Sequence, residues 1–76
     1  MLSSDDRAIL DFERSWWLEA GPKDQAIEWR LGLSAAAYYT DLLRIVFDAA
    51  ALAYDPLTVK RVRSLIEPAG EGELAV

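Results

Sequence analysis

Apolar side chains recur along most of the chain at intervals of three and four residues, the spacing of one face of an α-helix. No stretch alternates apolar and polar residues in the manner of a half-buried β-strand. Glycine, proline and capping serine or aspartate residues divide the pattern into four main helical segments. The pattern therefore predicts an all-α fold, a small bundle of about four helices.

The first predicted helix begins after Ser3 or Ser4, either of which can act as N-cap, and ends near Ala20, before Gly21 and Pro22. Wound at about 100° per residue, it gathers its apolar residues on one broad face. These residues are Ile9, Leu10, Phe12, Trp16, Trp17 and Ala20. We expect the stripe formed by Ile9, Phe12 and Trp16 to pack across the third helix.

The second predicted helix, 23–31, is short and ends at Gly32, a residue suited to a left-handed cap. Ser34 can cap the third helix, which runs from Ala35 to about Asp48. Apolar residues cover more than half the circumference of the third helix: Ala35, Tyr38, Tyr39, Leu42, Leu43, Ile45, Val46 and Phe47. An arc this wide indicates either the central helix of the bundle or part of an interface.

Residues 49–54 predict a loose turn of helix, after which Asp55 and Pro56 start the last helix, running to about Glu67. The apolar side of the last helix is formed by Val59, Val62, Leu65 and Ile66. We therefore expect one helical domain over residues 4–67. Residues 68–76 are small and acidic, and we expect them to form a disordered tail.

The amino-acid composition excludes several kinds of catalytic and metal site. The 76 residues suffice for one domain and include neither cysteine nor histidine, which removes the thiol nucleophile, the commonest metal ligand and the usual general base. We therefore expect no enzyme, no metal site and no cofactor. The acidic N-terminus is unlike a signal peptide, and no apolar run is long enough to cross a bilayer. These features favour a cytoplasmic protein without a membrane partner.

The net charge is −5, and it is unevenly placed. Three of the thirteen acidic residues, Glu67, Glu71 and Glu73, lie in the last ten positions, which leaves ten acids and eight bases over residues 1–66. A basic domain is the ordinary signature of a nucleic-acid-binding protein. This sequence lacks that signature.

Residues 24–34 nevertheless have the layout of a helix-turn-helix: a short helix, a glycine turn, an apolar residue, a capping serine and a longer helix. Apolar residues stand where such a motif needs its contacts, at Ile27, Leu31, Leu33, Tyr38 and Leu42. One position departs from the pattern, because Glu28 stands where the helices need a small residue to cross closely.

Three blocks of the sequence carry a resemblance that spans nearly all of residues 5–66. They are 6–17, ending in Phe-Glu-x-x-Trp-Trp, the pair Tyr38-Tyr39, and 55–63, which begins Asp-Pro-x-x-Val-Lys-Arg. In this order they resemble an actinobacterial family of short proteins of unknown function, encoded by hosts and their phages. Members are usually described as helix-turn-helix-like, so the resemblance implies DNA binding.

The candidate DNA contacts lie on two helices. Arg44 and Thr40 fall on the outward face of the third helix, where Arg44 is the one strong reader of base edges. Lys60, Arg61 and Arg63 fall on the polar side of the last helix and could hold phosphates. The alternative is that these three cations form a solvated face or pair with the protein's own carboxylates.

Glu13 falls in the middle of the apolar face of the first helix. A buried carboxylate needs a partner, so we expect a structural pair with Arg30, Arg44 or Arg61, or with a tyrosine hydroxyl. Of the three tryptophans, Trp29 is the one we expect to be exposed enough to anchor a partner.

Two functions follow as alternatives. The first is a transcription regulator that binds duplex DNA through the helix-turn-helix, as a homodimer. The second is a protein-interaction module that docks on a larger host or phage protein through exposed aromatic residues and acidic patches. Self-association is also expected, because the wide apolar arc of the third helix would otherwise face water.

Overall fold

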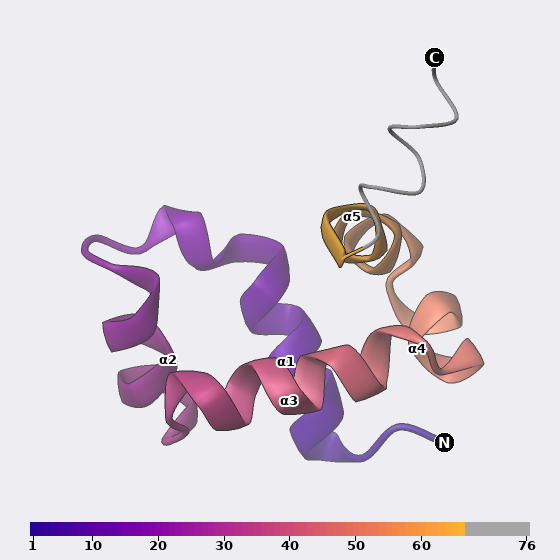
Figure 1. The fold of residues 1–76 in the computed structure, drawn as a ribbon, viewed down its shortest axis with the longest axis horizontal. Helices are drawn as coiled ribbons and strands as arrows, with labels where there is room; N and C mark the ends of the chain where they lie inside the picture. The colour runs from indigo at the N-terminus through magenta and orange to yellow at the C-terminus, as the bar shows by residue number, and fades with distance from the viewer. Residues whose placement is uncertain (67–76) are drawn as a thin grey trace.

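The computed structural model describes residues 1–66, and these form an all-α fold without strands, as predicted (Figure 1). The elements are α1 (Ser4–Ser15), the 3-10 turn η1 (Trp16–Leu18), α2 (Lys23–Leu31), α3 (Ala35–Val46), α4 (Ala49–Tyr54) and α5 (Pro56–Ile66). The predicted acidic tail, 68–76, and the expected last helical residue, Glu67, lie outside the described residues. No helix within residues 1–66 has the length and apolar character needed to span a membrane.

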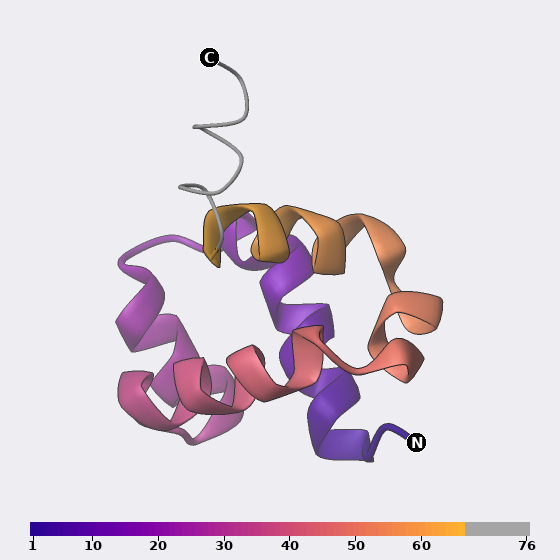
Figure 2. The same ribbon diagram turned by 45° about the vertical axis from the view of Figure 1, so that its right-hand side comes forward.

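Three helices form the centre of the molecule. α1, α3 and α5 pack against one another, and the short α4 joins the end of α3 to the start of α5 (Figure 2). α2 packs against α3 and against η1, at the opposite end of α3 from α4. The helix-turn-helix-like pair, α2 and α3, is therefore supported by α1 and η1.

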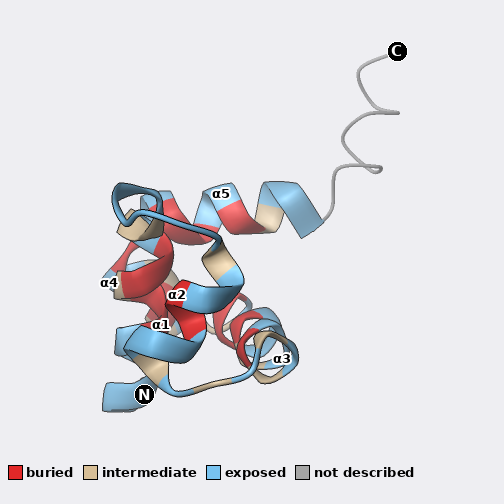
Figure 3. Cartoon of the chain, turned by 90° about the vertical axis from the view of Figure 1, so that its left-hand side faces the viewer, coloured by how far each residue is buried: buried red, intermediate tan, exposed pale blue. Residues whose placement is uncertain are grey.

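The core lies where these helices meet (Figure 3). The predicted packing of the first helix across the third is confirmed: Ile9 and Phe12 are buried, and Trp16 is partly buried against them. The Phe12 ring meets the Tyr38 ring edge-on, with centroids 5.6 Å apart. Such aromatic pairs supply a large share of the apolar contact in a domain of this size.

The first helix ends earlier than predicted. Its α-helical part stops at Ser15, whose backbone (φ −140°, ψ 14°) leaves the helical region, and the backbone N–H of Glu19 then donates to the Trp16 carbonyl within a 3-10 turn. The tighter winding of that turn changes the direction of the following side chains. Trp17 and Ala20, predicted on the buried face, are therefore exposed.

The caps that divide the helices are formed by the predicted residues. The Ser3 hydroxyl accepts from the Asp6 N–H (3.0 Å), and the Ser34 hydroxyl accepts from the Ala37 N–H (3.1 Å). Gly32 has a φ of +68°, and its N–H donates to the Glu28 carbonyl. α3 ends at Val46 and not near Asp48, because Asp48 caps α4 by accepting from the Ala50 N–H (2.8 Å).

Candidate functional site

The arginine predicted to read bases is held by carboxylates. Nη2 of Arg44 donates to Asp6 Oδ1 on α1 (3.0 Å) and lies 3.9 Å from Asp41 Oδ1. The hydrogen bond from Arg44 lowers the pKa of Asp6 below its usual value. Thr40 is exposed, and its hydroxyl donates to the Ala36 carbonyl one turn earlier (2.9 Å). Arg44 thus connects α3 to the start of α1.

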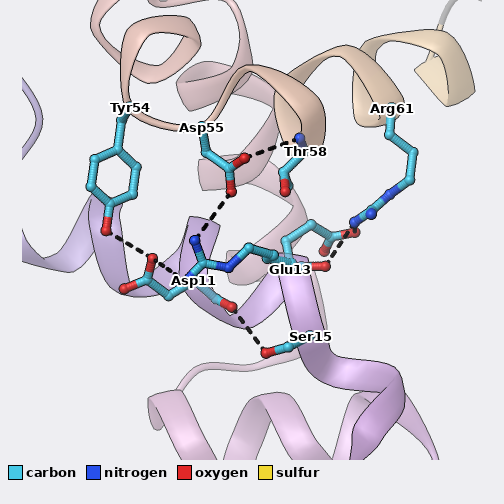
Figure 4. Close-up of polar contacts among 8 residues, drawn as sticks. Asp11, Glu13, Ser15, Tyr54, Asp55, Thr58 and Arg61 are labelled. Carbon is cyan, nitrogen blue, oxygen red and sulfur yellow. Dashed lines mark hydrogen bonds and ion pairs between the residues drawn. The ribbon is translucent and has the colours of Figure 1, made fainter.

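Two of the three cations predicted to hold phosphates also make internal contacts. Arg61 donates to the Glu13 backbone carbonyl (2.8 Å) and lies 3.8 Å from the Glu13 carboxylate (Figure 4). Its guanidinium also stacks 4.8 Å from the Trp17 ring centroid. Nε of Arg63 donates to the Val46 carbonyl at the end of α3 (2.6 Å). Lys60 is exposed and has no ion pair within residues 1–66. The predicted basic face is therefore reduced to one unengaged cation in the described chain.

Glu13 is buried, as predicted, with 4% of its surface exposed. The Tyr38 hydroxyl donates to its carboxylate, and Lys23 Nζ donates to the same oxygen at 2.9 Å. Burial, together with this hydrogen bond to Glu13, raises the pKa of Tyr38 far above its usual value. The predicted tyrosine partner is thus confirmed, and Arg61 supplies the predicted arginine pair.

The other two candidate arginines for Glu13 pair elsewhere, Arg30 with Glu19 and Arg44 with Asp6. Sequence reasoning missed Lys23, the first residue of α2. Its Nζ lies 5.0 to 5.4 Å from the ring centroids of Trp16, Tyr38 and Tyr39. A lysine at a helix start is ordinarily solvated. The need of the buried Glu13 carboxylate for a cation could have indicated Lys23 as a partner.

The outward side of α3 carries an apolar stripe. Tyr39, Leu43 and Phe47 follow one another at intervals of four residues and are 41%, 47% and 52% exposed. They stand beside the buried side of the same helix, which includes Tyr38, Leu42, Ile45 and Val46. The width of this apolar arc predicted either the central helix of the bundle or part of an interface. Half of it packs in the core and half lies open.

A groove of about 350 Å³ runs between α3 and α5, beside this stripe. Its lining is mostly apolar, with Glu13 and Lys23 as the charged members, and it consists of Glu13, Lys23, Tyr39, Leu42, Leu43, Val62, Leu65 and Ile66. Val59 and Val62, on the apolar side of the last helix, are buried, whereas Leu65 and Ile66 on the same side are 70% and 37% exposed. The last turn of α5 extends past the core, and no element of residues 1–66 covers it.

Trp29 stands apart from the groove on α2 and is exposed, as predicted. The described part of the chain holds no group of carboxylates that could bind a metal ion.

Taken together, the fold and the groove define a small all-α domain with an exposed apolar stripe on α3. A family model described as "Protein of unknown function (DUF3263)" matches residues 1–67, and the chain belongs to this family. The comparisons found no matching curated protein and no matching solved structure.

Proposed function

We propose that this protein is a binding module for another protein, which it contacts through the open stripe of α3 and the groove beside it. The observation that carries the proposal is the exposure of Tyr39, Leu43 and Phe47 on the outward side of α3. Contiguous exposed apolar surface in a small domain is typical of a protein-interaction site. Aromatic residues also supply much of the binding energy at such sites.

The face of α3 predicted to read DNA, which carries Thr40 and Arg44, is poorly suited to that role. Base edges are read by arginine, lysine, asparagine or glutamine. The face offers only Arg44, which is engaged with Asp6. Phosphate attraction is weak as well, because residues 1–66 carry more acids than bases. These features support the protein-partner function over the DNA-binding one.

Photo-crosslinking in a cell tests the proposal. A benzoylphenylalanine placed at Leu43 lies on the stripe, and the matched control is the same residue at Leu57, which is 81% exposed on α5 but does not line the groove. The family resemblance points to an actinobacterial host for the experiment. We expect a covalent adduct with a different protein from position 43 and not from position 57.

Other outcomes overturn the proposal. An adduct with a second copy from position 43 would make the face a homodimer interface, as the apolar arc alone suggests. Equal adducts from both positions, or none from position 43, would mean that the stripe has no specific partner.

A second candidate is a DNA-binding transcription regulator. The observation that favours it is the joint itself: α2 ends at the left-handed Gly32 and α3 starts at the Ser34 cap, as in a helix-turn-helix. Lys60 would contribute to phosphate binding. Retardation of duplex DNA at physiological salt, abolished by Lys60→Ala, would support this candidate against the first.

A further inference from the structure

We infer that the segment bound in the α3–α5 groove is an acidic amphipathic helix of the partner. This inference rests on the proposed function and adds the chemistry of the ligand. It depends on three features of the described residues: the spacing of the exposed apolar side chains, the size of the groove, and the signs of the charges around it.

The apolar features fit a helix better than an extended chain. Tyr39, Leu43 and Phe47 lie one turn apart along α3, so they form a ridge with a groove beside it. A second helix laid along this ridge presents apolar residues at i, i+3 or i+4 and i+7, the usual form of helix-in-groove recognition. The groove volume of about 350 Å³ is at the low end for binding pockets, so it takes apolar side chains and not a whole helix.

The charges around the groove are mostly positive, although the chain as a whole is acidic. Lys23 lines the groove, Arg63 lies over the Phe47 ring at 5.4 Å, and Arg61 lies beside Glu13. Glu13 is the one acidic residue of the lining and is already bonded to Tyr38 and Lys23 and paired with Arg61. Lys23 and Arg61 are thus offset by Glu13, and Arg63, which has no carboxylate partner within residues 1–66, is the cation left for an acidic ligand.

The remaining acids of α1 and α3 lie away from this lining. Asp6 and Asp41 contact Arg44, and Asp11 contacts Arg14 and Tyr54. An acidic ligand is therefore attracted to the groove and repelled by the surfaces around α1, which favours one docking position. Face-to-face docking of a second copy would bring the cations beside the two grooves close together. We therefore favour a different protein as the occupant.

Two synthetic peptides test the inference with the full chain. Both have the same leucine stripe over about four helical turns, and their flanking positions are glutamate in one and lysine in the other. Fluorescence anisotropy measures binding at low and at physiological salt. We expect the glutamate peptide to bind at least about tenfold more tightly, with a preference that shrinks as salt is added.

Matched variants locate the binding. Leu65→Gln should weaken binding of the glutamate peptide about tenfold or more, whereas Leu57→Gln, on the same helix and also exposed but outside the groove, should leave it unchanged. Arg63→Met keeps most of the side-chain length, and it should reduce the preference for glutamate over lysine. Circular dichroism of each variant confirms that it is folded.

Each further outcome has one meaning. Equal binding of both peptides that still depends on Leu65 would overturn the acidic-helix inference and leave the proposed function standing. Binding of neither peptide at micromolar concentration would also overturn the inference, while an adduct from position 43 would preserve the function. Concentration-dependent dimerisation that Leu65→Gln abolishes would overturn it in favour of a second copy.

Discussion

At the scale of single residues, the molecule is organised around the Glu13 carboxylate. It is buried on α1 and receives the Tyr38 hydroxyl from α3 and the Lys23 ammonium from the start of α2. Arg61 of α5 adds an ion pair from a fourth helix. A buried charge is tolerable only when it is fully paired, so Glu13 favours the one arrangement of helices that brings these partners together.

Replacing Glu13 with alanine should lower the free energy of unfolding by about 1–3 kcal/mol, because the Tyr38 hydroxyl and Lys23 lose their acceptor. Chemical denaturation of the variant measures the change. Glu28→Ala is the matched control, since Glu28 is exposed on α2 and should cost little. A neutral result at Glu13 would mean that water replaces the carboxylate without loss.

Ionisation of Tyr38 makes the stability of the fold depend on pH in the alkaline range. Its pKa is raised in the folded state, mainly by burial and then by Glu13, whereas an unfolded tyrosine ionises near pH 10. The stabilisation is therefore complete below pH 10 and is lost as pH rises above it.

We expect Tyr38 to ionise only when helical structure is lost. Tyrosinate absorbance, taken as the difference between the protein and Tyr38→Phe, should rise together with the loss of the helical dichroism signal. Ionisation of Tyr38 in a fully helical protein would contradict the buried hydrogen bond.

At the scale of elements, the joint between α2 and α3 depends on Gly32. Its φ of +68° is in the left-handed region, and a Cβ there would meet no neighbouring atom within 4 Å. The cost of Gly32→Ala is therefore conformational and not steric, and we expect about 1 kcal/mol of destabilisation. Gly32→Asn should cost less, because asparagine tolerates this region. Thermal unfolding of the two variants and of the unchanged protein measures these differences. Equal stability of all three proteins would contradict the conformational explanation.

Local signals in the sequence predicted most of these elements. Ser3, Gly32 and Ser34 act on their own neighbours, so their positions could be inferred without knowledge of the fold. The end of α1 could not, because the change to a 3-10 turn at Trp16 breaks the uniform winding that a helical wheel assumes.

The candidate site was harder to predict, because it depends on how the helices pack against one another. The periodicity placed Leu65 on the apolar side of the last helix. Whether other helices extend far enough to cover Leu65 depends on tertiary packing, and Leu65 is exposed. The partners of Arg61 and Arg63 likewise lie 48 and 17 residues away in the chain. Burial of Glu13 was predictable because an acid within an apolar stripe is visible in the sequence itself.

At the scale of the whole molecule, apolar and charged groups are separated. The open apolar stripe and the groove lie together on α3 and α5, with Lys23 in the groove lining and Arg63 over Phe47, while α1 carries Asp5, Asp6 and Asp11. Because the net charge is negative, the positive region acts only at short range in physiological salt. A protein partner that also buries apolar surface gains from such a region more than a DNA backbone does.

DNA titration of the full chain gives the last prediction. Binding to duplex DNA should be weak and steeply dependent on salt, because only Lys60 is unengaged among the cations of α5 in the described chain. Lys60→Ala should reduce the low-salt binding and leave the melting temperature unchanged. Arg63→Ala should lower the melting temperature, since it removes the donor to the Val46 carbonyl at the end of α3.

Replacing Lys60, Arg61 and Arg63 together would therefore mix loss of charge with loss of stability, and each variant needs its own melting curve beside its titration. Binding that stays tight at physiological salt, and that Lys60→Ala weakens without any change in melting, would show that the arginines leave their internal partners for phosphate. In that case α2 and α3 act as a DNA-binding pair, and the apolar stripe of α3 becomes the surface through which two such chains associate on one duplex.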